Sequence, residues 1–167
     1  MKIYVDFEGI TRIFEQAQRE HRDFLFESEV YELIRLTGSE TVPRYSLLPK
    51  EARLDHDQLH AMPGEKIVIK IVSPFITHKS DLGGVRIVAK EPDKVLSTVR
   101  GMLYEVPETY ADLIERHPEH APEVYRGLKG EALTAAIARD LKGVLLVQYM
   151  PCPATFGNEL IVSLRRT

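Results

Sequence analysis

Two apolar runs of strand length, KIVIKIV at residues 66–72 and GVLLVQYM at residues 143–150, constrain the fold more than any other feature of this sequence. β-branched residues dominate the first run, and the second is almost continuously apolar, as in strands that are buried within a sheet. Much of the stretch between them has the apolar spacing of helices. A chain that places such strands in a sheet and covers the sheet with helices belongs to the mixed α/β class rather than to the helix bundles or β-sandwiches.

Helices are predicted on both sides of these strands. Apolar side chains at i, i+3, i+4 and i+7 indicate an amphipathic helix near the N-terminus, and Ser28 can cap a second helix that Gly38 ends. Tyr104, Tyr110 and Tyr125 fall within later helical pieces, where we expect them to pack. In chain order the sequence predicts helices over 8–22 and 28–37, an extended piece over 41–49, a polar connector over 50–65, strands over 66–74 and 83–90, a helix over 93–104, interrupted helical pieces over 107–142, and strands over 143–150 and 159–164.

Composition and charge exclude several classes of partner. The chain has a formal net charge of -3, which leaves no global positive field to bind a nucleic acid or an anionic membrane. Cys152 is the only cysteine, so no intramolecular disulfide can form, and the N-terminal residues carry charges where a signal peptide has its apolar core. We therefore expect a cytoplasmic protein with neither a nucleic-acid nor a membrane partner. His60, His117 and His120 lack partners at a metal-ligand spacing, so no zinc-type metal site is expected.

Residues that can carry chemistry concentrate in KIVSPFITHKSDLGGV, residues 70–85, where a strand runs into a polar turn and a glycine pair. Glycines let backbone N–H groups approach an anion closely, while lysine and histidine supply positive charge. The segment is neither a Walker A motif nor a GxGxxG motif, so a phosphate site and an ordinary hairpin connection are both open interpretations. On local grounds Lys70 can equally be a solvated strand lysine, His78 an exposed bystander, and Gly83 and Gly84 the requirement of a turn.

Three segments carry a resemblance to one family. KIVSPFITHKSDLGGVRI at 70–87 resembles, almost position by position, a signature of the ATP-grasp part of the NDP-forming acyl-CoA synthetases, which include ADP-forming acetate–CoA ligase and related protein acetyltransferases. ESEVYELIRLTGSETVPRY at 27–45 is similar to the family's Glu-x-Glu-x-x-x-Leu-Leu helix and the Val-Pro strand after it. GVLLVQYMPCPATFGNELIVSL at 143–164 resembles the strand, hinge and Gly-x-Glu-Leu strand that border the nucleotide. Together they cover most of residues 25–164.

The resemblance implies a role for individual residues, with ATP and Mg²⁺ as cofactors. Lys70 would contact the nucleotide phosphates, and the backbone of residues 148–150 would bind adenine. His78 matches the histidine that receives a phosphoryl group and passes it between active sites, a role that suits an imidazole nucleophile near neutral pH. We expect Lys70 and the loop at 78–85 to share a cleft with the strand at 144–150. The implied nucleotide-binding residues are Lys70, Ser73, Gly83, Gly84, Gln148, Tyr149, Met150 and Glu159.

The chain also departs from the family pattern. Tyr149 stands where the family usually carries a carboxylate, Ser163 replaces a common glycine, and residues 105–142 form a longer helical insertion. The family's Asp-x-x-Phe-Gly-Pro stretch and its Mg²⁺-binding acidic residues have no counterpart, which predicts a partial ATP-grasp domain that is inactive alone and binds Mg²⁺ only when complete. Its predicted parts are a lead-in over 1–26, a motif-bearing α/β part over 27–104, the insertion over 105–142, and the hinge and last strand over 143–167.

Two functions from different classes follow. The first is part of an NDP-forming acyl-CoA synthetase that binds ATP and transfers a phosphoryl group through a histidine, with CoA-binding and ligase domains or a subunit as its partners. The second is a catalytically degenerate nucleotide-binding or interaction module, which Tyr149 favours. A carboxylate–amine ligase is a third hypothesis, but that group lacks the HKSD and GGV pattern.

An uncovered terminal strand at 159–164 would also favour pairing with another copy of the chain.

Overall fold

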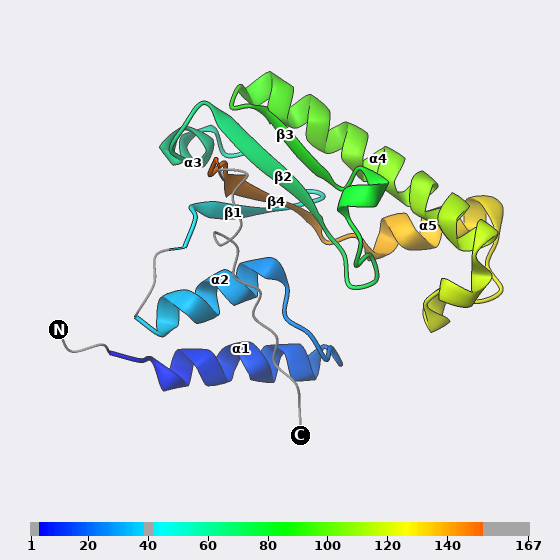
Figure 1. Ribbon diagram of the computed structural model, residues 1–167, viewed down its shortest axis with the longest axis horizontal. Helices are drawn as coiled ribbons and strands as arrows, with labels where there is room; N and C mark the ends of the chain where they lie inside the picture. The colour runs from blue at the N-terminus through cyan, green and yellow to red at the C-terminus, as the bar shows by residue number, and fades with distance from the viewer. Residues whose placement is uncertain (1–3, 39–41, 152–167) are drawn as a thin grey trace.

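A four-stranded antiparallel sheet in the order β1-β4-β2-β3 organises the structure, a computed structural model that describes residues 4–38 and 42–151 (Figure 1). β4 lies between β1 and β2, so the two long apolar runs of the sequence are paired directly. The predicted pairing of the strands at 66–74 and 83–90 and the mixed α/β class are confirmed. The predicted strand at 159–164, and pairing through it, lie outside the described residues. The strands are β1 (Tyr45–Pro49), β2 (Lys66–Val72), β3 (Val85–Ala89) and β4 (Gly143–Gln148).

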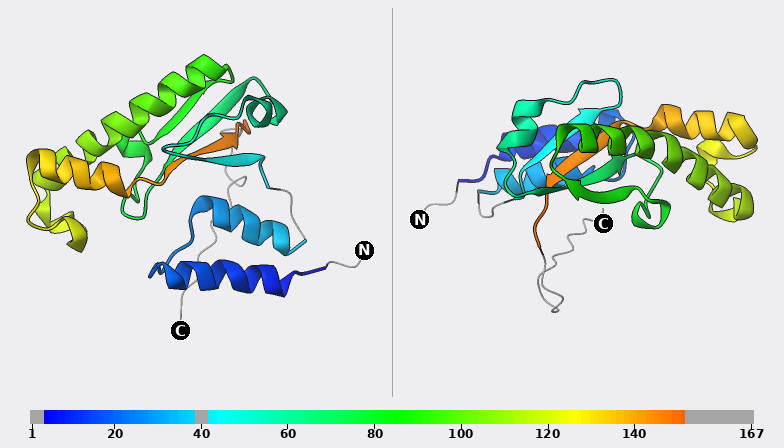
Figure 2. Two further views of the ribbon diagram at one scale, coloured as in Figure 1. Left: turned by 180° about the vertical axis from the view of Figure 1, so that it is seen from behind. Right: turned by 90° about the horizontal axis from the view of Figure 1, so that it is seen from above.

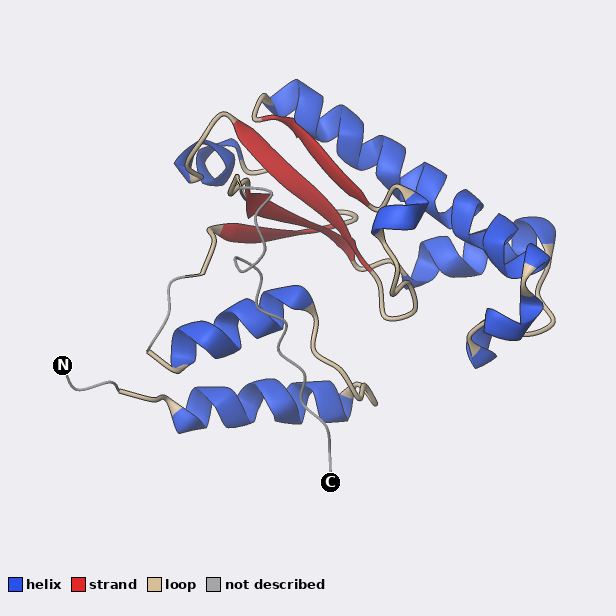
Figure 3. Cartoon of the chain, viewed as in Figure 1, coloured by secondary structure: helices blue, strands red, loops and turns tan. Residues whose placement is uncertain are grey.

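Helices cover both faces of this sheet. The hairpin of α1 and α2 lies on one side, and α4 and α5 lie on the other (Figures 2 and 3). In the part of the chain that the structure describes, no helix combines the length and apolar character needed to cross a membrane. The helices are α1 (Phe7–Arg19), α2 (Glu27–Leu36), α3 (His56–Ala61), η1 (Ser80–Leu82), α4 (Pro92–Arg116), η2 (Pro118–His120), η3 (Glu123–Tyr125) and α5 (Gly130–Asp140).

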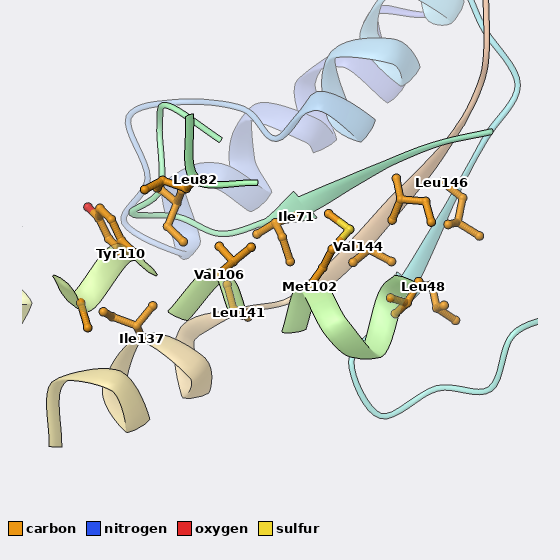
Figure 4. Packing of buried hydrophobic residues seen from close by; sticks show 14 of the residues in the cluster. Leu48, Ile71, Leu82, Met102, Val106, Tyr110, Ile137, Leu141, Val144 and Leu146 are labelled. Carbon is orange, nitrogen blue, oxygen red and sulfur yellow. The ribbon is translucent and has the colours of Figure 1, made fainter. Parts of the chain in front are cut away.

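The two faces of the sheet are packed very unequally. Ile67, Ile69 and Ile71 of β2 are fully buried and join the main core beneath α4 and α5. Alternate residues of a strand point to opposite faces, so Lys70 and its neighbours at i±2 face the α1–α2 hairpin. On that side the buried apolar cluster is small. Its members are Val72, Leu145 and Val147, with Phe26, Tyr31, Tyr45 and Val68 partly buried against them. The residues labelled in the close view of the main core are Leu48, Ile71, Leu82, Met102, Val106, Tyr110, Ile137, Leu141, Val144 and Leu146 (Figure 4).

α4 is longer than the sequence predicts. It runs unbroken from Pro92 to Arg116 through Pro107, where we expected helical pieces to begin. An internal proline lacks the donating N–H and costs about 3 kcal/mol in a helix. Pro107 and its neighbours on the same face are buried against the core, and this burial offsets that cost. Tyr110 packs there as predicted, whereas Tyr104, on the outer face, is 68% exposed and does not pack.

α2 begins one residue earlier than expected, and its cap differs. The residue that precedes its first turn is Phe26 rather than Ser28, and the Phe26 N–H donates to Glu29 Oε2 at 2.7 Å. Arg22, in the link from α1, donates to both oxygens of Glu29 at 2.9 and 2.7 Å and is only 6% exposed. Because a bidentate arginine holds Glu29 in place, this carboxylate replaces the expected serine as the determinant of the helix start.

Candidate functional site

Residues 73–84 connect β2 to β3 in a turn that hydrogen-bonds to itself. Ser73 is 4% exposed, and its Oγ accepts from the N–H groups of Phe75 at 3.2 Å and Ile76 at 3.3 Å. The carbonyl of Phe75 in turn accepts from the Tyr110 hydroxyl at 3.0 Å, which fastens the turn to α4. The Ser73 hydroxyl oxygen thus accepts hydrogen bonds from N–H groups of its own turn. Its expected contact with a nucleotide stays a prediction.

The glycine pair closes the same connection. Gly83 has φ +68 and its N–H donates to Ser80 O at 3.2 Å, while the Gly84 N–H donates to Lys79 O at 2.7 Å. Gly84 O accepts from the Ile71 N–H at 2.8 Å, which fixes the turn to the end of β2. Both glycine N–H groups therefore donate within the turn, and the pair holds Lys79 close to β2. Direct contacts of the two glycines with a nucleotide stay predictions.

Gly84→Ala is expected to lower the free energy of unfolding by about 1–3 kcal/mol. A Cβ at this position would lie 2.9 Å from the carbonyl oxygen of Lys79, so the turn would have to open. The control is Gly101→Ala in α4, where the nearest atom is the flexible end of Glu105 and where better helix propensity should raise stability by up to about 1 kcal/mol. Urea unfolding of both variants measures the difference. Equal effects would contradict a steric role for Gly84.

Two side chains of opposite charge pair where β2 runs into this turn, and Lys79 follows on the turn itself. Lys70 Nζ donates to Glu27 Oε1 at 2.5 Å, and the Tyr31 hydroxyl donates to the same oxygen at 2.5 Å. Burial lowers the pKa of Lys79, and the positive charge of Lys70 lowers this pKa further, while Glu27 opposes the change. Burial and the hydrogen bond to Glu27 raise the pKa of Tyr31, which keeps its phenol protonated and donating. Lys70 thus contacts the Glu27 carboxylate directly, and Lys79 on the following turn interacts with both groups through their charges.

The register of the sheet shows which predicted residues share a face. Lys70 lies opposite Leu145 of β4, and Gln148 lies opposite Ile67, so the side chains of Lys70 and Gln148 point to opposite faces. The Tyr149 ring, in contrast, lies 5.9 Å from Lys66 Nζ, on the face of Lys70. We call this side of the sheet the lysine face. Its residues are Lys66, Val68, Lys70, Val72, Leu145, Val147 and Tyr149.

The residues of the predicted hinge follow the end of β4. The Gln148 N–H donates to Arg44 O at 2.7 Å, and Gln148 Oε1 accepts from the Arg44 N–H at 3.1 Å. Met150 is 60% exposed. Glu159 lies outside the described residues. Gln148 is therefore engaged with the segment before β1, and its contact with adenine, like those of Tyr149 and Met150, stays a prediction.

The lysine face is covered rather than open. α2 packs on it through Phe26 and Tyr31, and Lys70 retains 26% exposure of its side chain. Two cavities, of about 410 and 340 Å³, lie elsewhere: one between α1 and α2 and one beside η3. No residue that we expected to bind a nucleotide lines either of them. α2 therefore covers the Lys70 end of the lysine face, and the cleft that we expected Lys70 and the loop at 78–85 to share with the strand at 144–150 stays a prediction.

His78 lies in the exposed part of the turn, next to Lys79. Within residues 4–38 and 42–151 its side chain has no hydrogen-bond or ion-pair partner. Nor do these residues bring three or more His, Cys, Asp or Glu side chains together as a metal site. An exposed imidazole without a partner is accessible to a phosphoryl donor, and its role as an acceptor stays a prediction.

Sequence reasoning missed Glu27, Tyr31 and Lys79. Glu27 lies 43 residues before Lys70, and no local spacing relates the two. The available signals were the position of Glu27 in the helix that resembles the family's Glu-x-Glu pattern, and the position of Lys79 beside His78 in the main motif.

The sequence profile of the ATP-grasp domain family matches residues 16–117 of this chain. The chain is 29% identical over 154 residues to the beta subunit of ADP-forming acetate–CoA ligase I from Pyrococcus furiosus, covering 92% of this chain and 52% of that protein. It is 37% identical over 86 residues to ADP-forming 4-hydroxybutyrate–CoA ligase from Nitrosopumilus maritimus, covering 52% of this chain and 12% of that protein. Among solved structures, ACD1 of Candidatus Korarchaeum cryptofilum in complex with coenzyme A gives a TM-score of 0.43 at 21% identity, over 86% of this chain and 49% of that one. The chain spans about half the length of the Pyrococcus relative.

Proposed function

This chain belongs to the ATP-grasp domain family, and on that premise we propose that it is the nucleotide-binding part of an ADP-forming acyl-CoA ligase. One observation carries the proposal: Lys70 pairs with the Glu27 carboxylate, and the partly buried Lys79 lies on the turn that closes back on the end of β2 through Gly84. Two ammonium groups with one counter-charge form a site that a polyphosphate would stabilise. The similarity to two ADP-forming CoA ligases supports this assignment.

In the proposed complex, the lysine face holds ATP along β2 and β4. Lys70 and Lys79 bind phosphate oxygens at one end, and the backbone of residues 148–150 binds adenine beyond the other end of β4. ATP-grasp ligases use ATP together with Mg²⁺, which prefers phosphate oxygens and a few carboxylates. In this proposal Lys70 and Lys79 bind and orient the phosphates.

For the complete ligase we propose phosphoryl transfer through His78. An imidazole nitrogen forms a bond to the terminal phosphorus of ATP as the bond to ADP breaks, and the phosphoryl group then passes to the carboxylate of the acyl substrate. In this proposal, acyl-CoA formation also needs CoA-binding and ligase domains or a partner subunit, and the Pyrococcus relative is itself named as one subunit of its enzyme. The single cysteine favours a reducing cytoplasm as the location.

Lys70→Ala is expected to weaken MgATP binding at least about tenfold, because the substitution removes an ammonium group at the phosphates. The control is Lys94→Ala, which removes the same charge from an exposed position on α4 and should change the affinity by less than about twofold. Chemical-shift titration of the chain with MgATP measures both, and it reports weak binding directly. An equal loss in the two variants would show that Lys70 has no specific role and would contradict the nucleotide site.

A degenerate module is the second candidate function, and two observations favour it. Tyr149 replaces the usual hinge carboxylate, and Glu27 already engages Lys70. The module would bind MgATP in the same titration but would not place phosphate on His78 when its partner domains are supplied. The two functions are therefore separated by phosphoryl transfer and not by binding.

A further inference from the structure

The Glu27 carboxylate occupies the position on Lys70 that an incoming anion would need. One of its oxygens accepts from both Lys70 Nζ and the Tyr31 hydroxyl, each at 2.5 Å. Carboxylate and phosphate oxygens make the same charge-assisted hydrogen bonds with an ammonium group. Lys70 cannot present its ammonium group fully to a polyphosphate while this ion pair is intact.

The helix that carries Glu27 is attached only lightly to the sheet. α2 has no fully buried residue, whereas α4 buries residues along most of its length. The contacts of α2 with the sheet include the ion pair to Lys70, the partly buried Phe26 and Tyr31, and a ring contact of 5.2 Å between Tyr31 and Tyr45. A helix that buries so little apolar surface can separate from the sheet at a low free-energy cost.

We propose that Glu27 is an internal competitor of phosphate, and that a polyphosphate binds the lysine face by displacing the Glu27 carboxylate and moving α2 away. This inference rests on the proposed function, because it concerns the same site. It adds that the structure is a closed state in which α2 covers the site and that Glu27 sets the apparent affinity for the ligand.

Charge balance supports this direction of exchange. Lys70 and Glu27 neutralise each other, and the partly buried Lys79 on the following turn adds a formal charge of about +1. A polyphosphate brings several negative charges to two ammonium groups and interacts with both at once. A polyphosphate therefore interacts more favourably with the two ammonium groups than the single Glu27 carboxylate does. A monovalent anion that replaced this carboxylate would add little interaction energy.

Glu27→Gln tests the inference with inorganic tripolyphosphate as the probe. The amide keeps the shape of the side chain but removes the competing charge, so the variant is expected to bind tripolyphosphate about tenfold more tightly than the unmodified chain. Tyr31→Phe removes the second hydrogen bond to the carboxylate and should tighten binding about threefold. Glu15→Gln, at an exposed position on α1, makes the same change in net charge and should leave the affinity within about twofold.

Hydrogen exchange provides a readout of helix movement that is independent of affinity. Saturating tripolyphosphate should speed exchange of the α2 amides in the unmodified chain and leave those of α4 unchanged. The inference is overturned if Glu27→Gln binds tripolyphosphate no more tightly than Glu15→Gln, or if the α2 amides become slower to exchange when the ligand is bound. Failure of the proposed function would give a different result. Glu27→Gln would still tighten the binding of tripolyphosphate as expected, but MgATP would bind no more tightly than tripolyphosphate in any variant.

Discussion

Gly143→Ala is expected to lower the free energy of unfolding by at least about 4 kcal/mol, more than Gly84→Ala or Gly64→Ala. Gly143 opens β4 with φ +138, and an added Cβ would lie 2.1 Å from Leu48 O, 2.8 Å from Pro49 Cα and 2.9 Å from Lys50 N. All three are backbone atoms of the neighbouring strand and its turn. Because β4 is also paired to β2 at Val72, the strand cannot move away from one neighbour without losing contact with the other.

Gly64→Ala is the matched control for this prediction. Gly64 also has a positive φ, of +86, but nothing lies within 4 Å of an added Cβ. Its substitution should cost about 1–2 kcal/mol, from backbone conformation alone. Urea unfolding, followed by circular dichroism, gives both values. If Gly143→Ala is no more destabilising than Gly64→Ala, the close approach of β1 to β4 is not a constraint on the fold.

His78→Ala is expected to reduce acyl-CoA formation by at least about a thousandfold when the chain acts with its partner domains. The proposed route passes through a bond between phosphorus and the imidazole, and alanine offers no nucleophile to form it. The exposed position of His78, with no side-chain partner in the described part of the chain, leaves the imidazole accessible for this chemistry. Steady-state assays of the complete ligase measure the loss.

His60→Ala, on the surface of α3, is the control and should retain full activity. The same preparations, incubated with radiolabelled ATP, should carry acid-labile phosphate at residue 78 only when histidine is present. Full turnover of His78→Ala, with label at another histidine, would exclude His78 as the phosphoryl carrier. Binding of MgATP without any label would instead favour the degenerate module.

The strands were predictable because their signal is local. β2 and β4 are apolar runs bounded by turns, and the pairing of β2 with β3 follows from the short connection between them. The continuation of α4 through Pro107 was not predictable, because burial against the core outweighs the local preference of proline. The start of α2 at Glu27 depends on Arg22 in the preceding link, and the helix propensity of the α2 residues does not indicate that contact.

The candidate site, like the fold, was predictable from the sequence only in part. Lys70 and the turn after it were found from one continuous motif, and the structure places Lys70 and Lys79 at one end of β2. Glu27 and Tyr31 were missed as members of the site, because their relation to Lys70 exists only after α2 has packed on the sheet. The opposite orientation of Lys70 and Gln148 follows from strand register, which depends on pairing partners far apart in the chain.

The strand order β1-β4-β2-β3 has a consequence for how this chain is made. β4 is the last described strand to leave the ribosome, yet it lies between β1 and β2 in the finished sheet. During synthesis β2 and β3 can form a hairpin early, while β1 has none of the described strands beside it until residues 143–148 emerge. The edges of β1 and β2 that pair with β4 stay unpaired throughout translation of α4 and α5. Nascent chains of this protein are thus most exposed to aggregation and to chaperone capture in that interval.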